Sequence, residues 1–354
     1  MSSVSMEYRK LGRSGVKVSA LCLGCMNFGD ATGEADAIAI IHRAIDEGIN
    51  FIDTSNSYGR GTSETIVGKA LAEGGRRDKV VLATKVTTGM GPGVNDRGSH
   101  RYHIAKQVEA SLRRLQTDHI DLYQLHYMDF STPLEESLRT LDDLVRAGKV
   151  IYTGCSKFAP AYLVEAIMTC QRYGWTYFVS EQPPYNLLDR RIENELVHTC
   201  QRFGVGIMAY GPIAAGILSG KYVRQGEQPP DSRYDKLDHR LSPAAMNAVD
   251  TLRPLAAEKG VALAELALAW VMRQPGITSP ITGPRTMEHL LSSLKALEVR
   301  FSEEDYRRID AICPPGTAVS DYYDMLVYRP YREAAGITKP VVKAPKPPAP
   351  KPGP

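Results

Sequence analysis

The chain has 354 residues, of which 43% are hydrophobic and 23% charged, and its formal net charge is +3. A chain of this length can bury a sizeable core in one large domain or in two small ones. So small a net charge gives no indication of a nucleic-acid partner or of a membrane surface.

The N-terminal residues MSSVSMEYRKLG contain no apolar stretch that could act as a signal peptide. No later run approaches the roughly 18 apolar residues of a membrane helix. The segment 8–19 (YRKLGRSGVKVS) predicts a small hairpin with its turn at Arg13–Gly15. We therefore expect a cytoplasmic protein that opens on a β-hairpin.

Apolar runs typical of buried strands then alternate with amphipathic segments typical of helices. The expected strands are 21–24, 50–53, 80–85, 120–126, 150–155, 177–182, 205–210 and 279–283. The expected helices are 34–48, 63–74, 102–116, 134–148, 160–174, 192–204 and one longer stretch at 243–273. Several helices end at glycine, as helix C-termini prefer, at Gly48, Gly148, Gly174 and Gly204.

The first apolar strand contains the pair Cys22 and Cys25, a CxxC spacing. This pair lies inside an apolar run and has no second pair downstream, so we expect neither a redox nor a metal role for it. The six cysteines are scattered along the chain, which is typical of a reducing compartment. No metal site is predicted.

The alternation of strands and helices predicts the fold. Continuous apolar strands separated by helices imply a parallel sheet buried on both faces. Eight strands and about eight helices in one chain favour a (β/α)8 TIM barrel with an N-terminal β-hairpin and a C-terminal extension. A doubly wound sheet is the competitor, but no GxGxxG follows the first strand. We expect the barrel domain to span 1–335 and a Lys/Pro-rich tail to span 336–354.

Four polar residues fall at or near the ends of three neighbouring strands, where the chemistry of such barrels lies. The second strand ends in Asp53, the third in Lys85 and the fourth in His126, and Tyr58 follows Asp53 in the next loop. Each alone has an ordinary explanation, as a turn former, a solvated strand end or a rim histidine. Their convergence on one rim favours an active site.

This set of side chains suits carbonyl reduction. A lysine ammonium stabilises a tyrosine phenolate and is expected to lower the pKa of Tyr58 from its usual value of about 10. Asp53 would hold Lys85 in place and keep it protonated, while His126 would orient a carbonyl and help to relay a proton. No side chain donates a hydride, so a nicotinamide cofactor is implied.

The chain also resembles the aldo-keto reductase superfamily from about residue 7 to 312, and within it the branch of bacterial reductases and potassium-channel β subunits. The resemblance lies in FIDTSNSYGRGTSE, VLATKV, DLYQLHYMD, TGCSKF, EQPPYN, AYGPIAAGILSGKY and SPITGPRTMEHL, and in YRKLGRSGVKVSALCLGCMNFG at the N-terminus. It implies that Tyr58 is the proton donor and that Asp53, Lys85 and His126 complete a catalytic tetrad.

The resemblance further implies a cofactor site. Ser156 and Gln182 correspond to carboxamide partners, Tyr210 to the aromatic that stacks on the nicotinamide, and 211–221 to the pyrophosphate loop. The position after Ser156 is usually Asn in the family and is Lys157 here. The expected contacts on this side are Met26, Asp53, Ser156, Gln182, Tyr210, Gly211, Pro212, Gly216 and Lys221.

The adenosine end of the cofactor is expected at 282–293. Arg285, Thr286 and a helix N-terminus suit a 2′-phosphate, which favours NADP(H) over NAD(H). His289 replaces the usual Gln or Arg, and Ser293 replaces the usual Asn. The expected contacts at this end are Gly283, Arg285, Thr286, His289 and Ser293.

The expected partner is a small carbonyl compound, either an aldehyde or a keto-sugar. We expect Asn27, Tyr58, His126 and Tyr127 to contact it. The segment 221–239 is either a loop over the cofactor or a passive surface excursion. The tyrosine-rich segment 320–333 is expected to pack against the barrel and to close the site or a homo-oligomer interface, with Asp321 and Asp324 in solvent.

Three functions remain open on the sequence. The first is an NADPH-dependent carbonyl reductase. The second is an NADPH-holding regulatory or scaffold subunit with slow turnover, as in the channel-subunit relatives. The third is a cofactor-free lyase or isomerase that uses Lys85 as a Schiff base.

Overall fold

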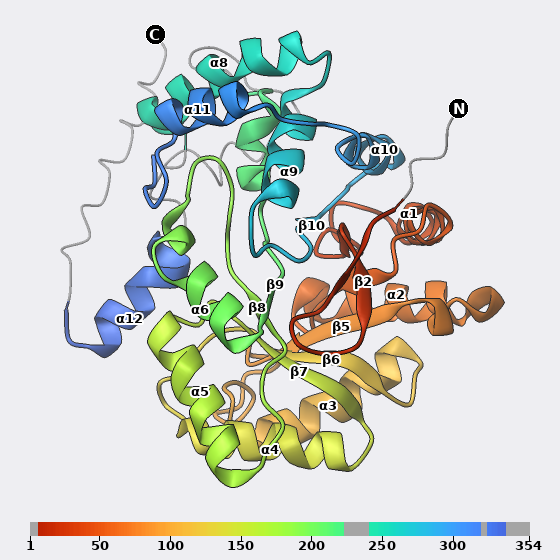
Figure 1. Ribbon diagram of the computed structural model, residues 1–354. Coiled ribbons are helices and arrows are strands. Elements are labelled where there is room, and N and C mark those ends of the chain that lie inside the picture. Colours follow the sequence, from red (N-terminus) through yellow and green to blue (C-terminus); the bar gives the residue numbers. More distant parts are fainter. Residues whose placement is uncertain (1–5, 223–240, 320–323, 338–354) are drawn as a thin grey trace, which may run out of the picture.

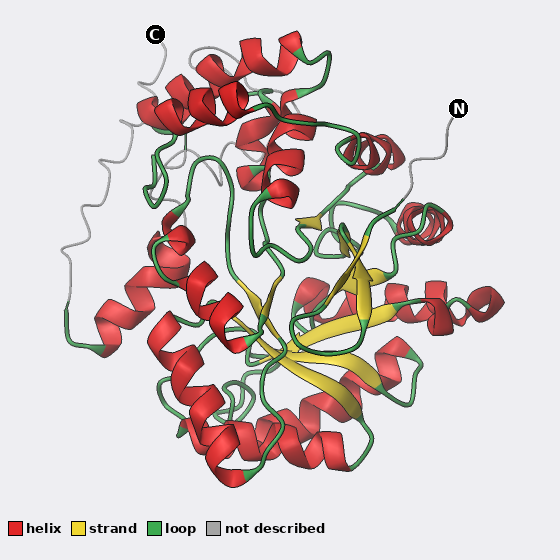
Figure 2. Cartoon of the chain, in the orientation of Figure 1, coloured by secondary structure: helices red, strands yellow, loops and turns green. Residues whose placement is uncertain are grey.

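The protein folds as a barrel of parallel strands inside a ring of helices (Figures 1 and 2). The computed structural model describes residues 6–222, 241–319 and 324–337. The sheet has eight strands in the order β10-β3-β4-β5-β6-β7-β8-β9, and every neighbouring pair is parallel. The backbone N–H of Ile281 donates to Ala209 O at 2.8 Å, which joins the two ends of this order. The predicted (β/α)8 barrel is confirmed.

Each predicted strand is present, in several cases as a shorter element than its apolar run. The strands are β3 (Cys22–Gly24), β4 (Phe51–Asp53), β5 (Val81–Val86), β6 (Ile120–Leu125), β7 (Val150–Ser156), β8 (Ser180–Gln182), β9 (Gly206–Ile207) and β10 (Ile281–Thr282).

The helices follow the strands in alternation and cover their outer face (Figure 1). Glycines 48, 148, 174 and 204 all have positive φ angles at helix ends, the conformation that closes a helix at least cost to glycine. The helices are α1 (Glu34–Asp46), α2 (Thr62–Ala72), α3 (Arg101–Leu115), α4 (Leu134–Arg146), α5 (Pro160–Tyr173), α6 (Leu196–Phe203), α8 (Pro243–Glu258), α9 (Leu263–Arg273), α10 (Met287–Lys295), α11 (Glu303–Ile312) and α12 (Arg329–Ala334).

The prediction of one long helical stretch at 243–273 is wrong in one respect, because this stretch consists of two helices. Gly260 adopts a φ of +65° after α8, a conformation that ends a helix. The carboxylate of Glu265 then accepts a hydrogen bond from the N–H of Ala262 at 3.0 Å, which stabilises the start of α9.

The core has an outer and an inner part. A large apolar cluster lies between the strands and the helices. A second, smaller cluster lies inside the barrel, at the end where the strands begin. Its buried members are Leu11, Val18, Cys22, Phe51, Val81, Ala83, Leu122, Val179, Met208 and Ile281.

The N-terminal hairpin closes the end of the barrel where the strands begin. Its strands β1 (Tyr8–Lys10) and β2 (Lys17–Ser19) are antiparallel, and Leu11 between them belongs to the inner cluster. Gly12 has a φ of +57°, and a Cβ at this position would lie 2.5 Å from the backbone oxygens of Gly204 and Val179. Only glycine lets the hairpin approach the strands this closely.

The C-terminal segment packs on the loops at the ends of the strands. The hydroxyl of Tyr331 in α12 donates to Lys157 O and accepts from Ala159 N, both at 2.7 Å. The Tyr331 ring also lies edge-on to Phe130, with ring centroids 5.2 Å apart. Packing against the barrel is thus confirmed, whereas closure of the site or of an oligomer interface stays a prediction.

Asp324, in the π-helix η7 (Asp324–Tyr328), does not point into solvent as expected. It is half-buried and forms ion pairs with Arg191 and Arg332, because the segment packs onto the surface of the barrel. Several predictions lie outside the described residues. They concern the loop residues 223–239, Asp321, Tyr322, Tyr323 and the tail residues 338–354.

Within the described ranges, no helix has both the length and the apolar character needed to cross a bilayer.

We predict that Tyr331→Phe lowers the free energy of unfolding by about 1–3 kcal/mol, because it leaves two backbone groups without their partner. Urea denaturation at equilibrium measures this change. Tyr102→Phe is the control, since Tyr102 is 66% exposed on α3. Equal midpoints and slopes of the urea curves for the wild type, Tyr331→Phe and Tyr102→Phe would show that the Tyr331 hydroxyl does not hold the C-terminal segment on the barrel.

Candidate active site

The strand register brings the predicted catalytic side chains together inside the barrel. Side chains alternate along a strand, so Phe51 and Asp53 share the inner face of β4, and Val81 and Lys85 share that of β5. The first member of each pair belongs to the inner apolar cluster. The second member, Asp53 or Lys85, lies nearer the C-terminal end of its strand. The barrel interior therefore has a polar layer at the strand ends above an apolar layer at the strand starts.

Lys85 and Asp53 form a buried ion pair at the centre of this polar layer. Lys85 Nζ lies 2.5 Å from Asp53 Oδ2, and it also donates to Thr54 O at 2.8 Å. Burial alone would lower the pKa of Lys85, but the attraction and hydrogen bonds of Asp53 and Tyr58 together outweigh burial and raise the pKa above its ordinary value. Lys85 is therefore a fixed ammonium.

Tyr58 is held beside this ammonium. It opens the short 3-10 helix η1 (Tyr58–Gly61), and its hydroxyl lies 3.2 Å from Lys85 Nζ. The expected lowering of its pKa is wrong for the protein alone. Burial raises the pKa of Tyr58, and the Lys85 ammonium offsets only part of this effect. Tyr58 is accordingly a neutral phenol, and Lys85 is its nearest cation.

His126 follows β6 and faces Tyr58 edge-on, with ring centroids 5.9 Å apart. Burial lowers the pKa of His126 well below its usual range, and the ammonium groups of Lys157 and Lys85 lower it further. The imidazole is therefore neutral near pH 7. Its Nδ1 lies 3.4 Å from the hydroxyls of Ser55 and Thr88, either of which can donate to it.

Two glutamines fix the second oxygen of Asp53. Gln124 Nε2 and Gln182 Nε2 donate to Asp53 Oδ1 at 3.1 and 3.0 Å, and Gln182 Nε2 also lies 3.2 Å from Gln124 Oε1. Gln124 was not predicted from the sequence. The available signal was a glutamine inside the apolar run IDLYQLH, two residues before His126 and so on the same strand face.

The predicted nicotinamide contacts lie around this polar layer. Because a carboxylate only accepts hydrogen bonds, Gln182 must turn its NH2 group to Asp53, and its Oε1 remains to accept from a carboxamide. Ser156 is buried and donates to Gln182 O at 2.8 Å, so its oxygen can still accept. Tyr210 is half-buried and packs against the inner cluster. These positions fit a nicotinamide.

The loop predicted to hold the pyrophosphate has the backbone that this role requires. Gly211, Ala214, Ala215 and Gly216 all have positive φ angles, and Gly211 O is fixed by the side chain of Asn186 at 3.1 Å. Small residues in such turns present N–H groups to anions. Pro212 lies within this loop, and Lys221 is exposed at its end. The loop therefore fits a diphosphate.

The predicted adenosine end lies at the start of α10. Thr286 caps this helix by accepting from His289 N at 3.2 Å, and its own hydroxyl proton stays available to a phosphate. Burial lowers the pKa of His289, Glu288 opposes this, and Lys221 and Arg285 lower it further. The charges of two cationic side chains, Lys221 and Arg285, therefore act on the start of α10, which fits a phosphate.

Two predicted contacts are engaged within the protein. The hydroxyl of Ser293 lies 2.7 Å from Thr282 Oγ1 and donates to His289 O at 2.8 Å. Asn27 is 5% exposed and donates to Gly283 O at 2.9 Å, so it links two loops. Their contacts with the cofactor and substrate stay predictions.

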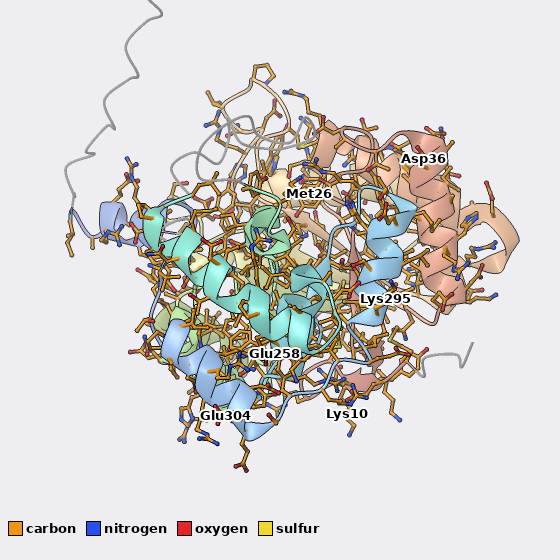
Figure 3. All side chains as sticks on the ribbon, turned by 90° about the horizontal axis from the view of Figure 1, so that it is seen from above. Lys10, Met26, Asp36, Glu258, Lys295 and Glu304 are labelled. Carbon is orange, nitrogen blue, oxygen red and sulfur yellow. The ribbon has the colours of Figure 1, made fainter. Side chains whose placement is uncertain are left out.

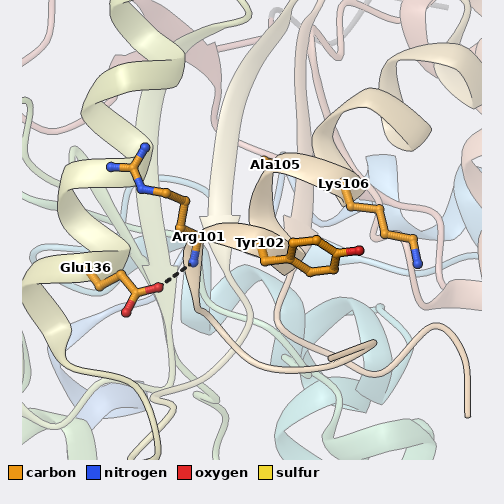
Figure 4. A pocket seen from close by; sticks show the side chains of 5 residues that line it. All are labelled: Arg101, Tyr102, Ala105, Lys106 and Glu136. Atoms are coloured by element: carbon orange, nitrogen blue, oxygen red, sulfur yellow. Dashed lines mark hydrogen bonds between the residues drawn. The ribbon is translucent and has the colours of Figure 1, made fainter. Parts of the chain in front are cut away.

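The predicted substrate side holds exposed apolar groups. Met26 is 49% exposed (Figure 3), and Tyr127, next to His126, is 36% exposed. A separate hollow lies on the helical layer between α3 and α4, where Arg101 N donates to Glu136 at 2.9 Å (Figure 4). Its lining comprises Arg101, Tyr102, Ala105, Lys106 and Glu136, and none of these belongs to the predicted site.

The pair Cys22 and Cys25 consists of buried free thiols, and burial raises the pKa of each well above its usual value. Neutral buried thiols are poor nucleophiles and poor metal ligands. The absence of a redox or metal role for this pair stays a prediction.

The fold and the strand-end cluster define the class, a (β/α)8 barrel with a polar site where its strands end. The sequence model of the aldo/keto reductase family matches residues 20–314. The chain belongs to the aldo/keto reductase family, whose members generally use a nicotinamide cofactor.

Three relatives show the range of this similarity. The chain is 42% identical over 330 residues to an uncharacterized oxidoreductase, YrpG, of Bacillus subtilis. This alignment covers 90% of this chain and 99% of the relative. It is 37% identical over 303 residues to a probable voltage-gated potassium channel subunit beta of Oryza sativa, covering 83% and 92%. It is 32% identical over 320 residues to an L-glyceraldehyde 3-phosphate reductase of Escherichia coli, covering 86% and 92%.

We predict that acid destabilises the wild type more than His126→Asn. The unfolded chain protonates His126 near its ordinary pKa of about 6.5, whereas the folded protein keeps it neutral to a much lower pH. The unfolded state then binds more protons, so the free energy of unfolding falls as the pH falls below about 6.5. The extra loss reaches about 1 kcal/mol at pH 5.5, measured by denaturation at several pH values. Parallel curves for the two proteins would contradict a depressed pKa.

Proposed function

We propose that this protein is an NADPH-dependent reductase that converts an aldehyde or ketone to the alcohol, with Tyr58 as the proton donor. The observation that carries this proposal is the short path from the Asp53–Lys85 ion pair to the Tyr58 hydroxyl. That arrangement places a permanent positive charge beside a neutral phenol, as proton donation to a carbonyl oxygen requires.

The reduced nicotinamide would supply the hydride that adds to the carbonyl carbon. Tyr58 gives its hydroxyl proton to the carbonyl oxygen, and Lys85 stabilises the phenolate that this transfer leaves. With Nδ1 accepting from Ser55 or Thr88, His126 carries its proton on Nε2 and can donate a hydrogen bond to the same oxygen. Solvent then restores the proton of Tyr58.

The cofactor is proposed to be held by Gln182 and Ser156 at the nicotinamide, by 211–221 at the pyrophosphate and by Arg285 and Thr286 at the ribose. The preference for NADPH rests on Arg285 and Lys221, whose positive charges act on the start of α10. A 2′-phosphate would be attracted by the positive charge and by the helix N-terminus there, whereas a neutral 2′-hydroxyl would gain much less from either.

The alternative functions gain less support. A Schiff-base lyase needs a neutral lysine amine, but Lys85 is an ammonium that donates to Asp53, Thr54 O and Tyr58. A regulatory subunit is suggested by the similarity to probable voltage-gated potassium channel subunits beta of Oryza sativa and Arabidopsis thaliana. Steady-state turnover with a panel of aldehydes separates a reductase from a cofactor-holding subunit.

We predict that Tyr58→Phe abolishes carbonyl reduction while NADPH binds nearly as before, because the variant loses only the proton donor. Aldehyde-dependent oxidation of NADPH and a fluorescence titration of NADPH measure the two properties. Tyr173→Phe, at the outer end of α5, is the control. A Tyr58→Phe enzyme with more than about a tenth of wild-type turnover would refute the role of Tyr58.

We predict that Arg285→Ala weakens NADPH by about ten-fold or more and NADH far less, because only NADPH carries the 2′-phosphate. Equilibrium titration of each cofactor measures the two affinities. Arg307→Ala serves as the control, since Arg307 is exposed on α11 and pairs with Glu304. Equal weakening of both cofactors would mean that Arg285 does not bind the phosphate.

A further inference from the structure

We propose that Lys157 recognises an anionic group on the substrate, so that the preferred substrates are aldehydes or ketones carrying a carboxylate or a phosphate. This inference rests on the proposed carbonyl reduction and names its substrate class. It starts from a lysine at the end of β7 that is not part of the tetrad.

The backbone of Lys157 is fixed on both sides. Its N–H donates to Gln182 O at 3.3 Å, and its C=O accepts from the hydroxyl of Tyr331 at 2.7 Å. Its φ angle is +61°, which is uncommon for a residue with a side chain and needs such support. Tyr331 therefore acts as a positioning residue for Lys157.

The ammonium of Lys157 lies on the predicted substrate side of the tetrad. It sits 5.4 Å from the centroid of the Tyr127 ring, and that ring lies 6.2 Å from the ring of His126. The ring of His126 in turn lies next to that of Tyr58, with ring centroids 5.9 Å apart. A line of three neighbouring rings thus leads from the Lys157 ammonium to the proposed proton donor.

This ammonium has no anionic partner. In the described ranges of the chain, Lys157 Nζ forms neither an ion pair nor a hydrogen bond, and its only contact of note is the Tyr127 ring. Burial lowers the pKa of Lys157 to about 8, Lys85 lowers it too, and Glu181 offsets part of the effect. A half-buried cation without a counterion is costly, so an anion bound beside it is favourable.

The nearby carboxylates are already engaged. Asp53 is paired with Lys85, and Glu181 accepts from Cys155 Sγ at 2.9 Å and from Phe158 N at 3.1 Å. Asp129, three residues after His126, accepts from Ser99 N and from the side chains of Ser131 and Thr132. The protein therefore leaves the Lys157 charge to be matched by a ligand.

The test compares Lys157→Met, which keeps most of the length of the side chain and removes its charge, with Lys157→Arg, which keeps the charge. Lys106→Met is the control, because Lys106 is an exposed lysine on α3 and forms an ion pair with Asp96. Two substrate pairs each compare an anionic substrate with a neutral analogue, namely succinic semialdehyde with its methyl ester, and glycolaldehyde phosphate with glycolaldehyde. The two pairs separate a carboxylate from a phosphate.

We expect Lys157→Met to lower kcat/KM for the charged member of at least one pair by about ten-fold or more, mainly through KM. The neutral members should change little, and Lys157→Arg should keep the preference. Losses that are equal for charged and neutral substrates would overturn the proposal, as would a matching loss of NADPH affinity. Either result would mean that Lys157 supports the tyrosine ring or the cofactor.

A binding measurement keeps this test independent of turnover. Calorimetric titration of the wild type with butyrate, glycolate 2-phosphate and the neutral butanamide should show an affinity for an anion that Lys157→Met loses. If the wild type reduces no aldehyde but still shows this loss, the proposed function fails and the anion site stands. If aldehydes are reduced and neither anion binds more tightly than butanamide, the reductase stands and the anion site is refuted.

Discussion

The buried ion pair between Lys85 and Asp53 is the interaction on which the site depends. Each partner uses the other to remain charged inside the barrel, and removal of either would leave a buried charge alone, at a cost of about 3–5 kcal/mol. Thr54 O and Tyr58 accept the remaining protons of the ammonium, while two glutamines occupy the second carboxylate oxygen. The orientation of Tyr58, and of the amide of Gln182, therefore follows from one pair of opposite charges.

The pair can exist there because strand alternation separates two layers. On β5 the inward positions run Val81, Ala83 and Lys85, and on β6 they run Leu122, Gln124 and then His126 beyond the strand. The apolar members fill the end that the hairpin closes, which excludes water from beneath the ion pair. The low polarity of that layer strengthens the attraction between Lys85 and Asp53, and it also keeps Tyr58 and His126 neutral.

Strand ends and helix-ending glycines could be predicted from the sequence because both are local properties. The barrel and the meeting of Asp53, Lys85 and His126 followed from them. What could not be predicted depends on competition between distant groups. The ammonium of Lys85 suggested a lower pKa for Tyr58, but burial has the larger effect. Asp324 was expected in solvent because its partners Arg191 and Arg332 are not adjacent to it in sequence. Gln124 was hidden within an apolar run.

The same competition determines where free charge remains at the rim. Lys85 is neutralised by Asp53, and burial holds both Tyr58 and His126 in uncharged forms. Lys157 stands beyond the Tyr127 ring, and its ammonium forms no ion pair in the described ranges of the chain. The groups proposed to touch the carbonyl are therefore neutral or paired. The unpaired charge lies to one side, where it can attract an anionic group without competing with Tyr58 for the oxygen.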